Sequence, residues 1–458
     1  MSKTSTEQTI RPGGAAAPLF ADRELARLVV PLFIEQLLAV TVGVADTMMV
    51  SRCGEAAISG VSLVDMINLL IINLFAALAT GGAVVVSQFL GAQRRADATH
   101  AAGQLTVLSV LLGSGVGLVC IALARGILSV VYGTIGADVL AAGVIYLRIT
   151  ALSYPFLALY NAGAALARSM GDSRISMRVS IIMNIVNVTG NAVCIFGLGM
   201  GVEGVALPSL ASRVLAAVLM VRACRKPGNL IRLQAEKTID GAMARRILRI
   251  GIPSAFENSL FQAGRVLVVS IISTFGTVQI AANAVANNLD SMGCIPGQAI
   301  SLAMVSVVGR CIGALQPEQA VRYTRKLLGW AYCAMAVSNG LILLFLQPLL
   351  GLYDLTADTM ALAMLLVRIH AGCGIVLWPV AFVLPNALRA ANDVRFTMTV
   401  SIASMVTLRI VLSYILGVGF GLGALGVWYA MVADWVCRAS LFVWRWRSGR
   451  WRAKYHAD

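Results

Sequence analysis

Charged residues are scarce in this chain of 458 residues, and so are the residue types that build metal centres and disulfide frameworks. Asp, Glu, Lys and Arg together make up 12% of the sequence, well below the share that is usual in a soluble globular domain. Three histidines are too few to indicate a metal site, and no two of the nine cysteines form a Cys-x-x-Cys pair. The composition argues against a soluble domain, a metal-built fold and a disulfide framework, and we expect the cysteines to be packing residues.

The sequence also lacks the short motifs of common hydrolytic and metal-dependent enzymes. We find no His-Glu-x-x-His, no Gly-x-Ser-x-Gly and no paired-aspartate motif, each of which would supply a nucleophile, a base or metal ligands. We therefore expect a protein that is not an enzyme and that needs no cofactor.

Apolar residues dominate instead, at 59% of the chain, and the mean hydropathy is +0.83. A transmembrane helix needs about 20 predominantly apolar residues in a row. The sequence has twelve runs of this kind, at residues 25–50, 58–88, 98–124, 139–166, 175–199, 203–222, 248–275, 278–308, 327–350, 359–387, 397–419 and 422–444. It therefore predicts an all-α polytopic membrane protein with twelve transmembrane helices.

The chain contains two copies of one unit. Pro31, Glu35, Gly91 and Ala92 recur as Pro253, Glu257, Gly313 and Ala314, each 222 residues later. A second block recurs 221 residues later, where Arg168, Asp172, Arg174, Met177 and Ser180 match Arg389, Asp393, Arg395, Met398 and Ser401. A period of this length is far longer than a solenoid repeat, so the twelve helices are predicted to form two homologous six-helix bundles.

The duplication and the charges together predict five segments. A disordered cytoplasmic arm (1–24) precedes the N-terminal bundle (25–222), a cytoplasmic linker (223–247) leads to the C-terminal bundle (248–444), and a basic cytoplasmic tail (445–458) follows. The net charge of +15 comes largely from basic residues in alternate loops and in the tail, which by the positive-inside rule places both termini in the cytoplasm. We expect a multi-pass protein of the inner (plasma) membrane whose partner is the lipid bilayer and not nucleic acid.

One buried acid distinguishes the two copies. Asp46 lies in the first apolar helix, whereas the equivalent position in the second copy is Val268. A carboxylate that stays ionised and unpaired in an apolar helix is costly, so Asp46 is a default candidate for function. The two halves are expected to share a scaffold and to differ in chemistry.

Polar residues in the fifth and sixth predicted helices could assist this acid. Asn184, Asn187 and Asn191 lie on one helical face, and Ser209 offers a hydroxyl on the next helix. Their oxygens could help to coordinate a cation, or the amides could simply bond across helices. Both interpretations remain open at this point.

Other charges inside the predicted spans need partners. Arg265 cannot lose its proton, and Asp290 or Glu257 is its expected partner. Arg409 and Asp434 lie on neighbouring helices and are expected to form another pair. For these pairs a structural role is favoured, because buried ion pairs often set helix register without touching a ligand.

Each half also begins with a proline inside a predicted helix. Pro31 and Pro253 remove a backbone hydrogen bond and permit a bend, which is either a hinge or a fixed kink. Glu35 and Glu257 follow one turn later in equivalent places. That symmetry favours a scaffold or hinge role over an asymmetric coupling role.

Several motifs in order resemble one family of membrane exporters. They are Ser87-Gln88-Phe89-Leu90-Gly91-Ala92, the paired Leu166-Ala167-Arg168-Ser169-Met170-Gly171-Asp172 and Leu388-Arg389-Ala390-Ala391-Asn392-Asp393, and Gly201-Val202-Glu203-Gly204-Val205-Ala206. With twelve helices in two copies, residues 25 to 440 resemble the multidrug and toxic compound extrusion (MATE) exporters. The resemblance implies a V-shaped pair of six-helix bundles around a cavity that opens alternately to either side.

The resemblance also implies roles for individual residues. In the family, an aspartate fifteen residues after the first proline binds a cation or a proton, and Asp46 stands there. The DinF-like branch adds an asparagine and an aspartate on helix 5 and a hydroxyl on helix 6. Asn187, Asn191 and Ser209 match these places, although Asn191 replaces the acid. The NorM-like branch instead uses acids on helices 7 and 10, where this chain has Phe261 and Trp378.

The implied function is export of small organic, often cationic, compounds in exchange for H⁺ or Na⁺. Asp46 is the expected coupling acid and the possible Na⁺ ligand, with no other metal expected. Because each chain holds both halves, we expect a monomer. The alternative is a flippase for lipids or lipid-linked oligosaccharides, whose cavity would carry several unpaired arginines for an anionic headgroup.

Overall fold

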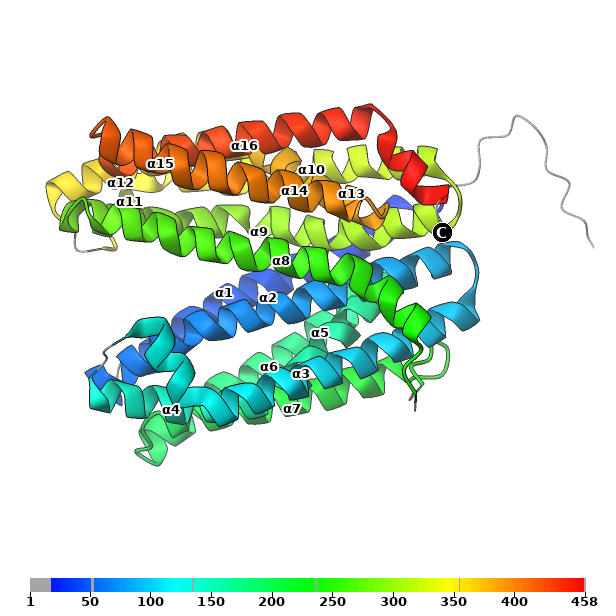
Figure 1. Cartoon of the computed structure of the whole chain (residues 1–458), viewed down its shortest axis with the longest axis horizontal. Coiled ribbons are helices and arrows are strands. Elements are labelled where there is room, and N and C mark those ends of the chain that lie inside the picture. The colour runs from blue at the N-terminus through cyan, green and yellow to red at the C-terminus, as the bar shows by residue number, and fades with distance from the viewer. Residues whose placement is uncertain are drawn as a thin grey trace, which may run out of the picture.

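A computed structural model describes residues 18–50, 53–133, 136–234, 236, 238–353 and 355–456. The described chain is almost entirely helical, and Figure 1 shows the helices gathered into two bundles, one above the other. Of the predicted disordered arm, residues 1–17 lie outside the described residues, as do residues 457 and 458 of the predicted tail.

The N-terminal bundle contains seven α-helices. They are α1 (Asp22–Val50), α2 (Glu55–Gly91), α3 (Arg95–Tyr132), α4 (Ala137–Leu152), α5 (Tyr154–Ser169), α6 (Ser173–Ala192), which continues as the π-helix η2 (Val193–Gly197), and α7 (Glu203–Cys224). Helices α4 and α5 meet at Ser153 with a bend of 48° and together make one span. Pro155 lies in the first turn of α5, where its missing N–H costs no helical hydrogen bond.

The C-terminal bundle repeats this order with more interruptions. It consists of α8 (Gly241–Ser273), α9 (Thr277–Gly313), α10 (Pro317–Leu344), α11 (Leu346–Leu350), α12 (Ala357–Trp378), η3 (Pro379–Val383), α13 (Leu384–Ala390), α14 (Val394–Ser404), η4 (Met405–Val411), α15 (Leu412–Tyr414), η5 (Ile415–Gly419) and α16 (Gly423–Arg447), followed by a 3-10 segment (Arg450–His456). The π-helical pieces join α12 to α13 and α14 to α15, so each of these runs forms one span.

Twelve helical spans result. Nine described spans are long and apolar enough to cross a bilayer, and the bent pair α4 and α5 is a tenth. The other two are α8 and α16, with 33 and 25 residues, which are long enough but carry charged residues in their middle, such as Arg265 and Asp434. The predicted twelve-helix architecture is confirmed, and the protein is a multi-pass membrane protein.

The linker between the bundles is tied to α3 and α8. Asp240 caps α8, since its Oδ1 accepts hydrogen bonds from the backbone N–H groups of Ala242 and Met243. His100 on α3 lies 3.0 Å from both Asp240 Oδ2 and Glu236 Oε1. The hydrogen bond from His100, and then those from the two amides, hold the pKa of Asp240 below its usual value.

The two bundles touch most closely at one end. In Figure 1 they approach each other at the end that carries the C-terminus and diverge toward the opposite end. A methyl group on Gly91 would overlap the carbonyl oxygen of Arg310, and a methyl group on Gly313 would overlap that of Gln88. These two glycines are equivalent in the duplicated sequence. The bundles therefore meet backbone to backbone around a two-fold pseudo-axis, as small residues permit in membranes.

Side chains reinforce this contact in the same two-fold pattern. Gln88 Nε2 donates to the carbonyl oxygen of Ala390 at 2.9 Å, and Arg310 Nε donates to that of Ser169 at 2.9 Å. Gln88 corresponds to Arg310 in the repeat, and Ser169 corresponds to Ala390. We call these four residues the inter-bundle clasp, because each donor reaches across to the opposite bundle.

Helix α1 belongs to both bundles. Its first half packs into a hydrophobic core of the C-terminal bundle through Leu25, Leu28 and Leu32. Its last turns, in contrast, contribute Met49 and Val50 to the core of the N-terminal bundle. Pro31 lies in the first half, within an unbroken helix. A movement of one bundle against the other must therefore act on α1.

Substituting Gly313→Ala is expected to destabilise the protein by about 1–3 kcal/mol, because the added methyl group has no room beside Gln88. The measurement is thermal unfolding of the purified protein in detergent. Gly340→Ala on α10 is the matched control, since no atom lies within 4 Å of its added methyl group. An unchanged melting temperature for Gly313→Ala would contradict the close contact of the bundles.

Candidate functional site

Asp46 lies near the end of α1 beside two asparagines of α6. Asn191 Nδ2 donates to Asp46 Oδ1 at 2.8 Å. Asn187 lies one turn earlier on α6 and contacts Ser209 Oγ of α7 at 2.9 Å. We call these four residues the Asp46 cluster. The structure thus brings together Asp46 and three of the four polar residues that the sequence suggested as its helpers.

The neighbouring groups decide which way the amide of Asn187 faces. With its nitrogen toward the acid, it donates to Asp46 Oδ1 at 3.1 Å and Oδ2 at 3.3 Å, and its oxygen accepts from Ser209 Oγ at 2.9 Å. With its oxygen toward the acid, it faces only acceptors, an arrangement that needs a proton or a cation between the oxygens. The first orientation therefore suits an ionised, empty Asp46.

Most of the polar side chains in the Asp46 cluster are buried between helices. Asn187, Asn191 and Ser209 are buried, whereas Asp46 is half-buried. Asn191 Oδ1 is buried and has no hydrogen-bond partner among the described residues. An unpaired buried carbonyl oxygen is destabilising, and it is the kind of oxygen that a bound cation or a protonated carboxyl group would satisfy. Carboxylate, amide and hydroxyl oxygens together suit a hard monovalent cation.

Local sequence explains how α6 and α7 come this close. A methyl group on Gly190 would lie 2.7 Å from Pro208 Cβ, so glycine lets the two helices approach. That approach brings the side chains of Asn187 and Ser209 into contact. Asn184, by contrast, bonds weakly to Ser180 Oγ at 3.4 Å within α6, and the structure does not place it in the cluster.

A second acid lies in the same bundle. Asp65 of α2 accepts hydrogen bonds from Asn68 Nδ2 and Tyr146 OH, both at 3.2 Å. Asp65 and Arg213 lie close enough to Asp46 to interact with it electrostatically. Arg213 donates to Ser153 Oγ at 2.7 Å, at the bend between α4 and α5.

Arg213 was missed by the reasoning from sequence, although a signal for it exists. It lies four residues after Ser209 on α7, and residues at this spacing share a helical face. A cation on the same face as a proposed cation ligand is the feature to look for. In this position Arg213 adds a fixed positive charge beside Asp46 and Asp65.

Glu35 forms a separate site on α1. Its carboxylate accepts from Ser176 Oγ at 2.8 Å and from Tyr160 OH at 3.5 Å. Arg168 lies close enough to interact with it electrostatically. Because eleven residues separate it from Asp46, Glu35 is about 16 Å away along the helix. It does not belong to the Asp46 cluster.

Glu257, the equivalent of Glu35, forms a buried ion pair. Arg389 Nη2 lies 2.7 Å from Glu257 Oε1. Arg389 is the repeat equivalent of Arg168, so both copies place a glutamate near the same arginine. Among the described residues, the glutamate and the arginine form a direct ion pair only in the C-terminal copy.

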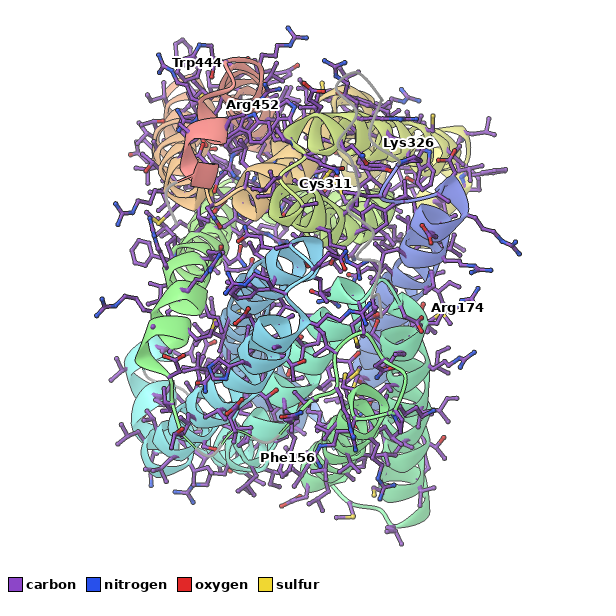
Figure 2. All side chains as sticks on the ribbon, turned by 90° about the vertical axis from the view of Figure 1, so that its right-hand side faces the viewer. Phe156, Arg174, Cys311, Lys326, Trp444 and Arg452 are labelled. Atoms are coloured by element: carbon purple, nitrogen blue, oxygen red, sulfur yellow. The ribbon has the colours of Figure 1, made fainter. Side chains whose placement is uncertain are left out.

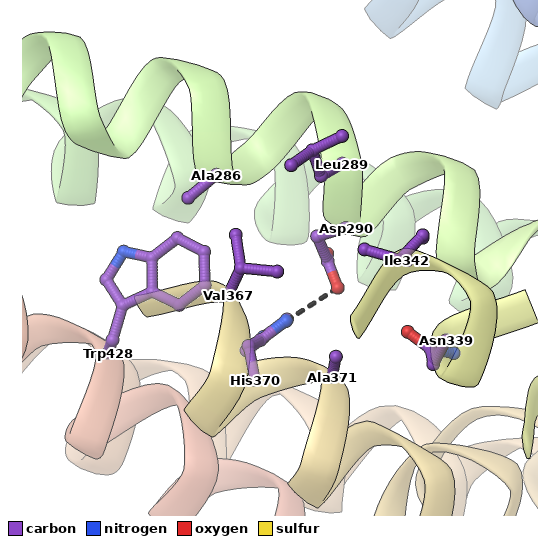
Figure 3. Close-up of a pocket in the computed structure, with 9 residues that line it drawn as sticks. All are labelled: Ala286, Leu289, Asp290, Asn339, Ile342, Val367, His370, Ala371 and Trp428. Carbon is purple, nitrogen blue, oxygen red and sulfur yellow. Dashed lines mark ion pairs between the residues drawn. The ribbon is translucent and has the colours of Figure 1, made fainter. Parts of the chain in front are cut away.

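Asp290 pairs with a histidine. His370 Nδ1 of α12 lies 2.6 Å from Asp290 Oδ1, as Figure 3 shows. Cys294 Sγ approaches the same oxygen at 3.7 Å, and the imidazole packs against Trp428 and Trp435 with centroid distances of 4.7 and 4.2 Å. His370 was not singled out from the sequence, because an isolated histidine in an apolar helix carries no motif.

The predicted partner of Arg265 is therefore wrong. Glu257 is held by Arg389 and Asp290 by His370, and Arg265 itself is exposed. The sequence predicts that these residues lie at a similar depth in the membrane. It does not predict which of their side chains face one another across the bundle. Basic residues far away in sequence, Arg389 and His370, lie closer to these carboxylates.

The predicted pair of Arg409 and Asp434 is confirmed, with 3.7 Å between Nη1 and Oδ2. Arg438, one turn after Asp434 on α16, is closer, with its Nε 2.9 Å from Oδ1. Both guanidinium groups also lie over the ring of Phe261, at 5.1 and 5.5 Å from its centroid. Arginines and one aromatic ring thus occupy the interior around Asp434.

The two bundles neutralise their interior acids differently. In the C-terminal bundle, the buried carboxylates of Glu257 and Asp434 have arginine partners and Asp290 has a histidine. In the described part of the N-terminal bundle, Asp46 and Asp65 are held only by neutral donors within hydrogen-bonding distance. An acid held by neutral groups can exchange a proton or a cation without breaking an ion pair.

Comparison with known proteins gives the same architecture. The MatE family model matches residues 31–193 and 253–415, one match in each half. The "Uncharacterized transporter YisQ" of Bacillus subtilis (strain 168) is 31% identical over 437 residues, covering 93% of this chain and 94% of that protein. The "Probable multidrug resistance protein NorM" of Thermotoga maritima is 25% identical over 441 residues, covering 94% and 93%.

Solved structures agree on the fold. A multidrug resistance MATE family transporter of the MOP superfamily, in an outward-facing conformation, has a TM-score of 0.87 at 21% identity, with 94% of this chain and 96% of that one covered. A MOP superfamily transporter from Pyrococcus furiosus, described as having a binding pocket of reverse polarity, also has a TM-score of 0.87, at 20% identity and the same coverage. With the family model matched in both halves, the chain belongs to the MatE family and is a membrane transporter rather than an enzyme.

Proposed function

We propose that this protein is a secondary active exporter that moves small organic, often cationic, compounds out of the cell in exchange for H⁺ or Na⁺. The observation that carries the proposal is the Asp46 cluster, in which asparagine amides hydrogen-bond the carboxylate and the nearby Arg213 interacts with it electrostatically without forming an ion pair among the described residues. Relatives that are named as probable multidrug resistance proteins, such as NorM of Thermotoga maritima, support multidrug export as the transport class.

The cluster supplies a simple exchange chemistry. When Asp46 is ionised, the nitrogens of Asn187 and Asn191 donate to it. When it takes up a proton or a cation, the Asn187 amide turns its oxygen inward, and the unpaired Asn191 Oδ1 gains a partner. Each state is hydrogen-bonded, so the acid can change charge inside the bilayer without a large desolvation cost.

We infer coupling from the position of Asp46 on α1, the helix that packs against both bundles. An ionised Asp46 favours a cationic compound, and loading Asp46 from outside releases that compound. Helix α1 carries Asp46 in one bundle and packs its first half into the other. Binding of a proton or cation at the Asp46 cluster therefore shifts the equilibrium between the orientations of the two bundles. Pro31 and Pro253 are the proposed hinges. This is alternating access through the different affinities of two states.

The remaining assignments follow the charge distribution. The end of the molecule at which the bundles touch holds the basic tail with Arg445, Arg447 and Arg450, which supports a cytoplasmic location for that end. We place the protein in the inner membrane with both termini cytoplasmic and propose that it works as a monomer. A lipid flippase is less well supported, since the deep arginines Arg409 and Arg438 are engaged with Asp434.

Asp46→Asn is expected to abolish coupling. In proteoliposomes under an imposed Na⁺ gradient or pH gradient, ion-driven ethidium transport should fall at least about tenfold, within the usual range of coupling free energies. The gradient that drives the wild-type protein identifies the coupling ion. If the variant transports ethidium at the wild-type rate with the same ion dependence, the cluster is not the coupling site.

A matched pair of asparagines on α6 tests the cluster separately. Asn191→Leu removes the donor to Asp46 Oδ1 and should reduce transport and shift its pH or Na⁺ dependence. Asn184→Leu is the control, because Asn184 bonds only to Ser180 among the described residues. Equal effects of the two substitutions would show that the amides act through general helix packing.

The ion pair of Glu257 and Arg389 is expected to be structural. Arg389→Gln leaves a buried carboxylate uncompensated and should destabilise the protein by about 3–5 kcal/mol. The double variant Glu257→Gln/Arg389→Gln should recover most of that loss and keep transport. Thermal unfolding and ethidium transport are measured on both. A stable double variant without ion-driven transport would instead assign Glu257 to coupling.

A further inference from the structure

We propose that a groove between α1 and α6 binds the headgroup of an anionic phospholipid. The groove holds about 500 Å³ and is lined by four arginines and an apolar strip: Arg23, Arg27, Arg174 and Arg178, with Ala26, Val30, Pro31, Ile34 and Met177. We call it the arginine groove. It goes beyond the proposed transport function, because the ligand is a membrane component and not the exported compound.

Helical spacing gathers the charges. Arg23 and Arg27 are four residues apart on α1, and Arg174 and Arg178 are four residues apart on α6, so each pair lies on one face of its helix. Figure 2 looks onto the end of the molecule that carries the C-terminus and shows Arg174 where α6 begins beside α1. The two pairs face the same groove from opposite walls.

These four guanidinium groups lack anionic partners among the residues that the structure describes. None of them forms a side-chain hydrogen bond or ion pair with another described residue, and no carboxylate lines the groove. The nearest acids along the chain are engaged elsewhere: Asp22 pairs with Lys326, Glu24 accepts from the backbone N–H of Ala21, and Asp172 accepts from the backbone N–H of Arg174. Four like charges in one groove repel one another, and a phosphate would relieve that repulsion.

The apolar strip decides between a lipid and a free anion. Val30 is 54% exposed and Ile34 is 37% exposed, and both follow the arginines along α1 toward the middle of the span. A ligand that fits has a phosphate at the end of the helices and a hydrocarbon chain that runs along them. Basic pockets between transmembrane helices near the cytoplasmic surface recognise anionic lipid headgroups in this way.

The repeat indicates that the fourth arginine is particular to the N-terminal half. Arg23, Arg27 and Arg174 recur in the second copy as Arg245, Arg249 and Arg395, but Thr399 stands where Arg178 would recur. In the second copy, Asp393 lines a pocket beside Arg249 and Arg395, whereas its equivalent in the first copy, Asp172, does not line the arginine groove. Only the first groove therefore combines four arginines with a lining free of acids. Its lipid would bridge α1 and α6, the helices that carry Asp46 and Asn191.

The test measures lipid retention by the full-length protein in detergent. Native mass spectrometry counts bound phosphatidylglycerol against phosphatidylcholine, and thermal unfolding is followed while dioctanoyl phosphatidylglycerol or inorganic phosphate is added. The variant Arg23→Gln/Arg27→Gln/Arg174→Gln/Arg178→Gln is compared with Arg95→Gln/Arg222→Gln/Arg325→Gln/Arg447→Gln, which removes the same charge from exposed positions elsewhere. Arg174→Gln/Arg178→Gln alone serves if the fourfold variant does not fold.

The wild type and the control variant are expected to retain phosphatidylglycerol selectively and to be stabilised by its short-chain form. The groove variant should bind it at least about tenfold more weakly, since it loses four cationic contacts to the headgroup. Equal retention by the groove and control variants would overturn the proposal. Equal stabilisation by inorganic phosphate would also overturn it, by assigning the groove to a free anion. Neither outcome depends on whether Asp46 couples transport.

Discussion

The structure depends on one constraint: a carboxylate inside a bilayer must be hydrogen-bonded or neutralised. This protein meets the constraint in two ways. The C-terminal bundle uses fixed ion pairs, in which Arg389, Arg438 and His370 hold the interior acids. The N-terminal bundle holds Asp46 with asparagine amides. Fixed pairs stabilise one charge state, whereas an amide can donate or accept. The difference is that the interior acids of the C-terminal bundle have basic partners, whereas Asp46 has only neutral donors within hydrogen-bonding distance among the described residues.

Duplication provides the frame in which this asymmetry can act. Gly91 and Gly313 bring the backbones of α2 and α9 together, and Gln88 and Arg310 reach the matching carbonyl oxygens of the opposite bundles. This contact consists of backbone surfaces and a few hydrogen bonds. Arg310 of the clasp lies over the ring of Phe20, just before α1 begins, whereas Asp46 lies near the other end of that helix. Communication between the two places must pass through rigid helices, and α1 contacts both bundles.

The arginine groove adds the membrane to this picture. It lies at the start of α1 and α6, whereas the Asp46 cluster lies toward their ends. A bound headgroup would hold the two helices together at the end where the bundles touch. Lipid and coupling ion would then act on the same pair of helices from opposite ends.

Much of the fold could be predicted from sequence, and the reasons are physical. Lipid requires every backbone polar group to be satisfied within its own helix, so long apolar runs determine the spans, and the repeat of Pro31 as Pro253 determines the two bundles. Asp46, Asn187, Asn191 and Ser209 were also found from sequence, since polar residues are rare in such helices. The interior ion pairs were harder. The sequence predicted the pair of Arg409 and Asp434 correctly, but the predicted partners of Arg265 were wrong. It gave no prediction for Arg213 or His370.

The sequence by itself thus determined which residues cross the membrane, how the chain is duplicated and that Asp46 has no acidic counterpart in the second copy. Only the tertiary structure decided which basic group reaches which acid, that Asn184 stays outside the cluster, and that four arginines share one groove. Helical periodicity gives the face of a residue on its own helix. The rotation of each helix about its axis, which sets what that face meets, comes from packing against all its neighbours at once.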